Sequence, residues 1–273
     1  VNMVLAGLLA GTITPGGAGG EPVRVHELYR AGVKIGDATA VVIMERVLDG
    51  IILTVMGILL MILMTTYIAS IFNPVLLILV LIAWIFLISF LLIPVFAIKY
   101  PERTKILLMR LVNWVIPRLG RFSASHQSIA ERADHEIDNL FASMSHFTGT
   151  AWRGLFFGGI VTALFWISEF LVASVIMMGL GLGPYILESF FFQILIAIIM
   201  MIPLTPGAAG VTELSTSSLY ALIIPSGMIG IFVILWRFVT FYLNIILGAV
   251  AGLAIFKREL RYKEKEEADG KIG

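Results

Sequence analysis

The chain has 273 residues, of which 59% are hydrophobic and 14% are charged, with a net charge of +1 and no cysteine. A chain this apolar cannot bury its hydrophobic residues in one soluble core, so most of them must face lipid. The near-neutral charge gives no reason to expect a nucleic-acid partner. Without cysteine, disulfides and thiolate metal sites or nucleophiles are excluded. We therefore expect an all-α polytopic membrane protein.

The N-terminal segment is apolar but short, and it ends in a Gly-rich turn. Residues 4–13 are too few to cross a hydrocarbon layer of ~30 Å at ~1.5 Å per residue. The turn Thr14 to Gly19 follows, and a short helical segment is expected over 21–30. The opening lacks the basic region of a cleavable signal peptide.

Four apolar blocks are long enough to span a bilayer. They cover residues 49–70, 75–98, 152–179 and 226–256. Lys and Arg gather before the first block, between the second and third, and after the last, whereas the connections 71–73, 180–187 and 224–226 hold none. By the positive-inside rule the basic segments are cytoplasmic, which predicts a multi-pass protein of the cell membrane with a cytoplasmic C-terminus.

The basic segment 99–151 is predicted to form two amphipathic helices. Residues 106–119 are suited to a helix at the level of the headgroups, and 129–144 carry an apolar stripe at helical spacing. His126, His135 and His146 lie among acids here but lack a metal-ligand spacing. We expect no metal ion and no cofactor.

Two parts of the sequence repeat each other at an offset of 191 residues (205 − 14). The turn at Thr14 matches the turn at Thr205, and twelve identities fall between positions 14 and 57, including Arg46 with Arg237. The positive charges place the two copies in opposite orientations, which predicts an inverted-topology repeat. Residues 189–204 barely suffice to cross before Pro206, so we expect two re-entrant or broken helix hairpins whose Gly-rich tips meet at mid-membrane.

The predicted organisation is a single membrane domain. Repeat one covers about 1–98, the cytoplasmic amphipathic segment 99–151, repeat two about 152–256 and a charged cytoplasmic tail 257–273. The candidate hinge or turn residues are Thr14, Pro15, Gly16, Gly19, Thr205, Pro206, Gly207 and Gly210.

Charged side chains within the hydrocarbon are costly and are often functional. Together with Tyr242 and the charges near the two turns, they are the candidate substrate-binding residues. These are Glu21, Arg24, Glu45, Arg46, Asp49, Glu213, Arg237 and Tyr242.

A purely structural role is the alternative for several of these residues. Arg46 can pair with Asp49 or Glu45 and lock two helices together, whereas the helix of Arg237 holds no acid, so pairing is less expected there. Glu21 and Glu213 suit helix caps as well as a ligand. Two intramembrane guanidiniums beside free helix N-termini favour an anion such as a phosphate ester.

Several motifs resemble the flippase-like membrane domain of lysylphosphatidylglycerol synthases and of stand-alone bacterial and archaeal proteins. They are TPGGAGGEPVR at 14–24, ERVLD at 45–49, PLTPGAAGVTE at 203–213 and WRFVTFY at 236–242. The resemblance implies a membrane domain that carries a lipid with a phosphate headgroup, such as an aminoacyl-phospholipid or a polyprenyl-phosphate-linked sugar, between leaflets. It also implies that further helices precede Val1, and it does not extend to the soluble synthase domain.

The sequence is compatible with three functions. The first is lipid translocation with the headgroup held by Arg46 and Arg237, the second is secondary transport of a small anion, and the third is anchoring of a lipid-modifying glycosyltransferase. An enzyme is not expected, because the sequence has no clear nucleophile and base, metal-ligand spacing or nucleotide loop. The expected partner is a membrane lipid with an anionic or zwitterionic headgroup. A homo-oligomer or a lipid-modifying enzyme is left open as a further partner.

Overall fold

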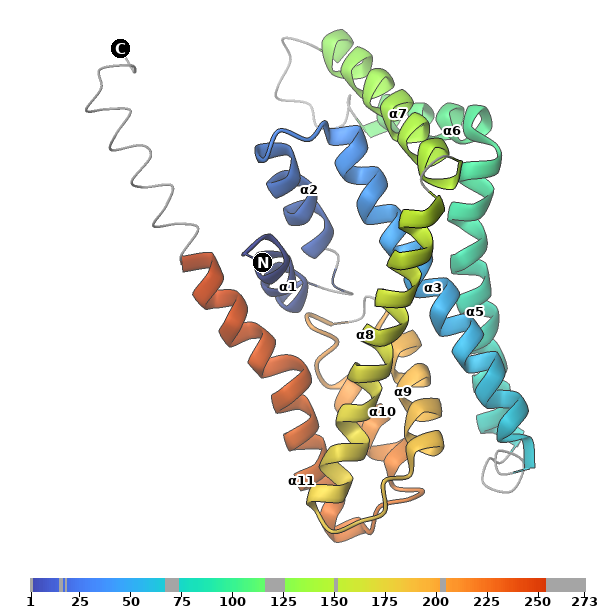
Figure 1. Cartoon of the computed structure of the whole chain (residues 1–273), viewed down its shortest axis with the longest axis vertical. Helices are drawn as coiled ribbons and strands as arrows, with labels where there is room; N and C mark the ends of the chain where they lie inside the picture. Colours follow the sequence, from blue (N-terminus) through green and yellow to red (C-terminus); the bar gives the residue numbers. More distant parts are fainter. Residues whose placement is uncertain are drawn as a thin grey trace. The chain divides into compact units, whose positions relative to one another are not determined.

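The computed structural model describes residues 2–14, 17, 19–66, 74–115, 126–149, 152–201 and 205–253. Its regular elements are helices (Figure 1), which confirms the predicted all-α class. In chain order they are α1 (Asn2–Ile13), α2 (Gly20–Arg30), α3 (Ile35–Leu63), α5 (Pro74–Lys99), α6 (Pro101–Val115), α7 (His126–Thr148), α8 (Trp152–Gly179), α9 (Ile186–Met200), α10 (Val211–Tyr220), α11 (Ser226–Arg237) and the π-helix η2 (Phe238–Tyr242).

Three of the described helices are long and apolar enough to cross a membrane. They are α3, α8 and the continuous helix Ser226–Leu253, which contains α11 and η2. Helix α5 is 26 residues long and matches the predicted block 75–98. By contrast, the internal helices α9 and α10 have 15 and 10 residues, too few for a ~30 Å layer at ~1.5 Å per residue. The described part of the chain therefore combines helices long enough to span a membrane with shorter ones.

Helix starts recur at the offset found in the sequence. Helices α2 and α10 begin at 20 and 211, and α3 and α11 begin at 35 and 226, so both differences are 191 residues. The copies differ further along. The second has the π-helical η2 at 238–242, whereas the corresponding residues 47–51 of the first continue the α-helix α3. The repeat is thus one of secondary structure as well as of sequence.

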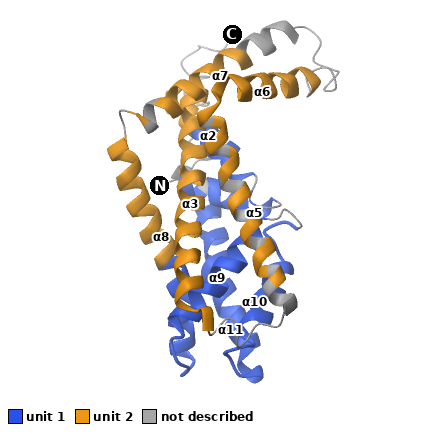
Figure 2. Ribbon diagram, turned by 90° about the vertical axis from the view of Figure 1, so that its right-hand side faces the viewer, with its two compact units in different colours: residues 1–27, 168–273 blue, residues 28–167 orange. Residues whose placement is uncertain are grey.

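The chain forms two compact units (Figure 2). Unit 1 contains residues 1–27 and 168–273, and unit 2 contains residues 28–167. The border between the units passes through α2 and α8 and so does not follow the repeat. The first Gly-rich turn consequently belongs to the same unit as the second.

In unit 2, α7 is docked on the N-terminal end of α3. The backbone N–H of Gly36 donates to Glu136 Oε2 at 2.8 Å, and the Ser143 hydroxyl is hydrogen-bonded to Asp37. Beneath these polar contacts is a small apolar core made of Ala40, Met44 and Met144, with Ile43, Leu140, Phe141 and Leu155 packed against it. The apolar stripe predicted for 129–144 therefore packs, at its C-terminal end, against a membrane helix.

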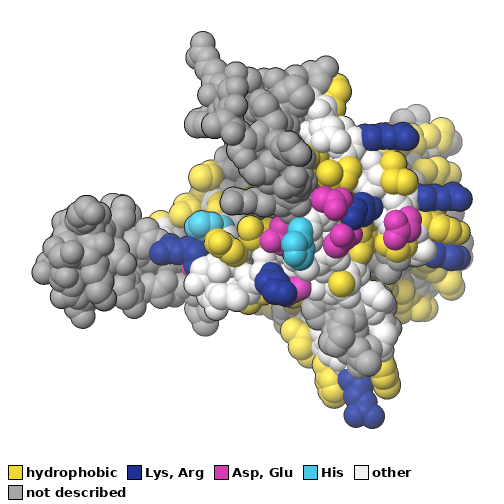
Figure 3. Space-filling view, turned by 90° about the horizontal axis from the view of Figure 1, so that it is seen from above, with side chains coloured by type: hydrophobic (Ala, Val, Ile, Leu, Met, Phe, Trp, Pro, Cys, Tyr) yellow, Lys and Arg dark blue, Asp and Glu magenta, His cyan; other side chains and the backbone are white. Residues whose placement is uncertain are grey.

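Helix α6 is held to α7 by charge. Lys105 Nζ lies 3.0 Å from Asp134 and 2.6 Å from Asp138, and its hydrogen bonds to Asp138 and Asp134 raise the pKa of the Lys105 ammonium above its ordinary value. Seen from above, charged side chains of both signs gather on this face (Figure 3). The large hydrophobic side chains of α6 that remain exposed are Ile106, Leu107, Leu111 and Trp114. This arrangement is compatible with the predicted location of α6 at the headgroups.

The docking of α7 depends on glycine at position 36. A Cβ there would lie 2.8 Å from the Glu136 carbonyl oxygen and 2.9 Å from the Leu140 backbone nitrogen, whereas one at Gly227, the repeat partner, would meet nothing within 4 Å. We expect Gly36→Ala to cost about 1–3 kcal/mol by pushing α7 away, and Gly227→Ala to be neutral or to stabilise by about 0.5–1 kcal/mol. Unfolding temperature in detergent and protease cleavage of α7 measure both effects. Equal behaviour of the two variants would contradict this prediction.

Candidate functional site

The second Gly-rich turn connects α9 to α10 through a left-handed backbone. Gly207 has φ +59° and Gly210 +82°, values that glycine adopts without a steric penalty, whereas Ala208 at φ +53° is strained. The Thr205 hydroxyl donates to the Ala209 carbonyl at 2.9 Å and closes the turn. The sequence therefore breaks the helix here and leaves backbone polar groups for side chains to satisfy.

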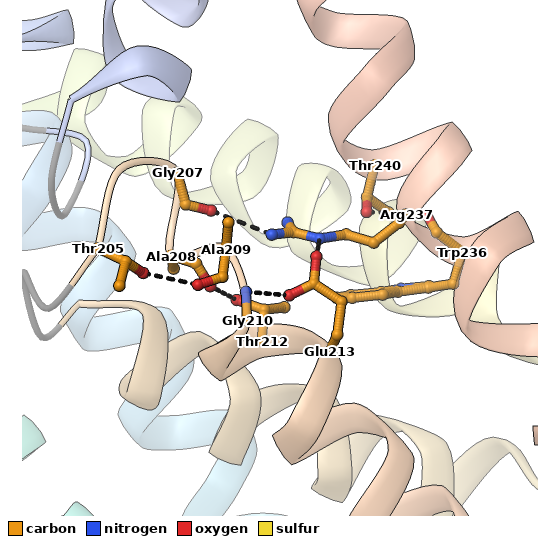
Figure 4. A network of polar contacts seen from close by, with 10 residues as sticks. All are labelled: Thr205, Gly207, Ala208, Ala209, Gly210, Thr212, Glu213, Trp236, Arg237 and Thr240. Atoms are coloured by element: carbon orange, nitrogen blue, oxygen red, sulfur yellow. Dashed lines mark hydrogen bonds and ion pairs between the residues drawn. The ribbon is translucent and has the colours of Figure 1, made fainter. Parts of the chain in front are cut away.

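Arg237 and Glu213 join this turn to α11 (Figure 4). Arg237 Nε donates to Glu213 Oε1 at 2.6 Å, and Arg237 Nη2 donates to the Gly207 carbonyl at 3.1 Å. The second carboxylate oxygen of Glu213 accepts from the backbone N–H of Gly210 at 2.6 Å. Glu213 thus serves as the cap of α10 and as the counter-ion of Arg237. The acid that the helix of Arg237 lacks is supplied by α10.

The guanidinium is almost completely buried. The Arg237 side chain is 4% exposed, and its guanidinium lies 4.3 Å from the centre of the Phe241 ring, a cation–π contact. The π-helix η2 starts at the next residue, and short π-helical turns within α-helices are frequent at functional sites. A buried cation next to a helix break is an unusual and costly arrangement in a membrane protein.

The first Gly-rich turn contacts the second within unit 1. The backbone N–H of Gly207 donates to the Thr14 carbonyl at 3.4 Å. The Thr14 hydroxyl donates to the Ala10 carbonyl and accepts from the Gly19 N–H, each at 2.8 Å, so it ties its own turn together. Pro15 and Gly16 lie outside the described residues. The structure therefore brings together the described parts of the two predicted turns.

The other candidates of unit 1 lie at α2 and η2. Glu21 and Arg24 face each other on the first turns of α2 at 3.9 Å. A Cβ at Gly7 of α1 would lie 2.6 Å from Arg24 Cγ, so α1 and α2 pack closely there. Tyr242 is half exposed and its ring contacts that of Phe241 at 5.4 Å. The turn residue Pro206 is exposed.

The membrane charges of the first repeat form a different network in unit 2. Arg46 Nη1 lies 3.1 Å from Asp49 on the same helix, and Asp49 also accepts from the Trp166 indole of α8 at 2.9 Å. The side chains of Arg46 and Asp49 are 46% and 15% exposed. Glu45 is partly buried on α3. The pair that we considered as a helix lock is therefore within one helix, and Asp49 makes the link to α8 through Trp166.

Three residues in these networks and helices were not among the candidate functional residues chosen from the sequence. Phe241 follows Arg237 by four residues, a spacing that puts both on one helix face and could have revealed the contact. Glu169, partly buried in α8, is the sole acid of the block 152–179 and for that reason was detectable. Trp166 gave no signal, because its partner Asp49 is 117 residues away in the chain.

Metal binding finds no support in the described part of the chain. No group of three or more His, Cys, Asp or Glu side chains there could hold a metal ion. What the described site offers chemically is a buried guanidinium, backbone N–H groups at a helix start and a carboxylate that bridges them. Guanidinium and backbone N–H donors in this combination bind carboxylate or phosphate oxygens.

Fold and site together define a multi-pass helical membrane protein with an internal ion pair at a helix break. Residues 1–248 match the family described as the lysylphosphatidylglycerol synthase TM region, and the chain belongs to this family. The resemblance seen in the sequence motifs is thereby confirmed.

Two archaeal proteins are similar to the chain over most of its length. A UPF0104 membrane protein of Archaeoglobus fulgidus is 27% identical over 252 residues, which cover 92% of this chain and 74% of that protein. A UPF0104 membrane protein of Pyrococcus horikoshii is 28% identical over 260 residues, covering 93% and 76% respectively. No solved structure matches the chain.

Proposed function

We propose that the protein moves a lipid with a phosphate headgroup between the two leaflets of the cell membrane, as a transporter of the flippase or scramblase type. The observation that carries this proposal is the buried guanidinium of Arg237 beside a Gly-rich helix break. Discontinuous helices whose N-terminal ends point at anionic substrate groups are common binding elements of secondary transporters. The phosphate of a lipid headgroup is an anion that a guanidinium binds well.

The helix lengths and the repeat support a transporter architecture. Helix α9 is too short to cross, so we propose that α9–α10 and, by the repeat, α1–α2 are re-entrant hairpins that enter from opposite sides, with the C-terminus cytoplasmic. The common offset of 191 residues between helix starts supports two copies of one unit. The opposite orientation of the copies rests on the distribution of Lys and Arg.

Membership of the family supports a lipid as the transported molecule. The family is named for the membrane region of an enzyme that makes lysylphosphatidylglycerol, a phospholipid with an amino acid on its headgroup. An aminoacyl-phospholipid or a polyprenyl-phosphate-linked sugar therefore suits the proposed substrate class. Arg46, Asp49 and Glu45 of unit 2 are proposed as further headgroup contacts.

Reconstitution tests the proposal with Arg46→Ala. The full chain is placed in vesicles that contain fluorescent phosphatidylglycerol, and a membrane-impermeant reductant reports the lipid that reaches the outer leaflet. We expect the protein to accelerate this exchange and Arg46→Ala to slow it at least about fivefold, because the Arg46 side chain is 46% exposed and its removal costs the headgroup about one charged hydrogen bond.

Arg110→Ala is the matched control, since Arg110 is an exposed arginine of α6 outside the proposed site. Its exchange rate should equal that of the parent. Uptake of a small anion without lipid exchange would instead favour the secondary-transporter hypothesis. Exchange that is equally fast in Arg46→Ala and in the parent would remove Arg46 from the site.

A further inference from the structure

In the described structure the Arg237 site is closed by an acid of the protein itself. The two oxygens of Glu213 accept from Arg237 Nε and from the Gly210 backbone N–H, each at 2.6 Å. A guanidinium and the N–H at a helix start are the donors that a phosphate group uses. The carboxylate therefore occupies the position that an anionic ligand needs.

The two members of this ion pair are held unequally. Besides its ion pair with Glu213, Arg237 contacts the Gly207 carbonyl and the Phe241 ring. Its side chain is only 4% exposed. The side chain of Glu213 is 35% exposed and extends from the first turn of α10, next to the exposed residue Gly210. Rotation of the Glu213 side chain can thus release the carboxylate, while Arg237 stays in place.

A third donor, on the residue before Arg237, has no acceptor among the residues described. The Trp236 side chain is buried, and its Nε1 has no hydrogen-bond partner among the residues described. In Figure 4 its indole projects from α11 toward α10. A buried N–H without an acceptor is costly, and a ligand with several oxygens would satisfy it. Glu213 accepts from Arg237 and Gly210, and it is not a hydrogen-bond partner of Trp236.

We propose that Glu213 is a resident counter-anion that closes the Arg237 site when it is empty, and that a phosphate group displaces it. The phosphate then accepts hydrogen bonds from Arg237, the Gly210 N–H and Trp236. Exchange of one anion for another keeps the buried guanidinium neutralised throughout, which avoids the large cost of an isolated buried charge. The lipid form of this inference rests on the proposed function, whereas the anion exchange itself does not.

Binding measurements with Glu213→Gln test the exchange. The full chain in a non-ionic detergent is titrated with inorganic phosphate and, separately, with short-chain phosphatidylglycerol. We expect Glu213→Gln to bind the phosphate probes at least about tenfold more tightly than the parent, because a charged competitor is gone. The control is Glu188→Gln, which removes an acid from the first turn of the short helix α9 and should leave both affinities unchanged.

The two probes separate the outcomes. Tighter binding of both probes supports the exchange, with a lipid headgroup as the anion that displaces Glu213. Tighter binding of inorganic phosphate alone supports the exchange but excludes the lipid headgroup as the displacing anion. Unchanged or weaker binding in Glu213→Gln overturns the counter-anion role, even if the parent moves lipid. Failure of the parent to move lipid overturns the proposed function and leaves the phosphate titration as an independent test.

A second measurement covers the case in which Glu213→Gln does not fold. Carbodiimide labelling of carboxylates in the parent protein, read by mass spectrometry, reports how accessible Glu213 is. Addition of phosphatidylglycerol should accelerate labelling of Glu213 about threefold or more, because the displaced side chain faces solvent, and should not affect Glu188. Slower labelling of Glu213, or no change at saturating lipid, contradicts displacement.

Discussion

Arg237→Gln is expected to lower the free energy of unfolding by about 2–3 kcal/mol and to reduce lipid exchange at least about tenfold. The substitution removes the partner of Glu213, the contact with the Gly207 carbonyl and the charge over Phe241. Loss of one member of a fully buried pair costs about 3–5 kcal/mol. Here the orphaned carboxylate is 35% exposed and can reach solvent, which puts the cost at or below the lower end of that range. Chemical denaturation in detergent measures it.

Arg46→Gln is the matched stability control, because Arg46 is the repeat partner of Arg237. Arg46 is 46% exposed and pairs with Asp49 three residues away, so its loss should cost under about 1 kcal/mol. The double variant Arg237→Gln with Glu213→Gln should recover part of the stability lost in Arg237→Gln, by about 1 kcal/mol or more. Equal losses at Arg46 and Arg237, or strict additivity in the double variant, would contradict the importance of the buried pair.

The helices could be predicted closely from the sequence, because hydrophobic length and Gly-rich turns are local signals. The block 152–179 has the bounds of α8, and the predicted start at 226 is the start of α11. Local signals do not say which helices pack together. The docking of α7 on Gly36 and the grouping of α1 with the helices of the second repeat depend on contacts far apart in the chain, which no single-sequence periodicity encodes.

The sequence indicated both charged residues of the candidate site, but the ion pair between them was not predicted. Arg237 and Glu213 were both selected, yet a partner for Arg237 was sought on its own helix. Within residues 205–253 they are the sole base and the sole acid, and two isolated opposite charges in an apolar segment are expected to pair. The pairing was therefore available from composition. The left-handed backbone that aims the Gly207 carbonyl at the guanidinium was not, because it depends on how the turn folds.

Gly207→Val is the substitution that should affect this site most strongly. Gly207 has φ +59°, and a Cβ there would lie 2.6 Å from the Thr12 carbonyl oxygen and 2.7 Å from the Phe241 ring. Valine therefore meets backbone strain and two clashes at once, and we expect a cost above about 3 kcal/mol. The clashes would separate the two Gly-rich turns and move the Gly207 carbonyl away from Arg237. The yield of monodisperse protein in detergent and its unfolding temperature measure this loss.

Gly210→Ala measures the cost of backbone strain without a steric clash, and so separates the two effects that Gly207→Val combines. Gly210 has φ +82°, also a left-handed value, but a Cβ there would meet nothing within 4 Å. Its cost should be only the backbone strain, about 1–3 kcal/mol, with the Glu213 cap still formed. A variant at Gly207 that is no less stable than Gly210→Ala would mean that the two turns do not need to touch. If Gly207→Val alone unfolds, the contact between the turns is required for the fold, and the Arg237 site depends on it.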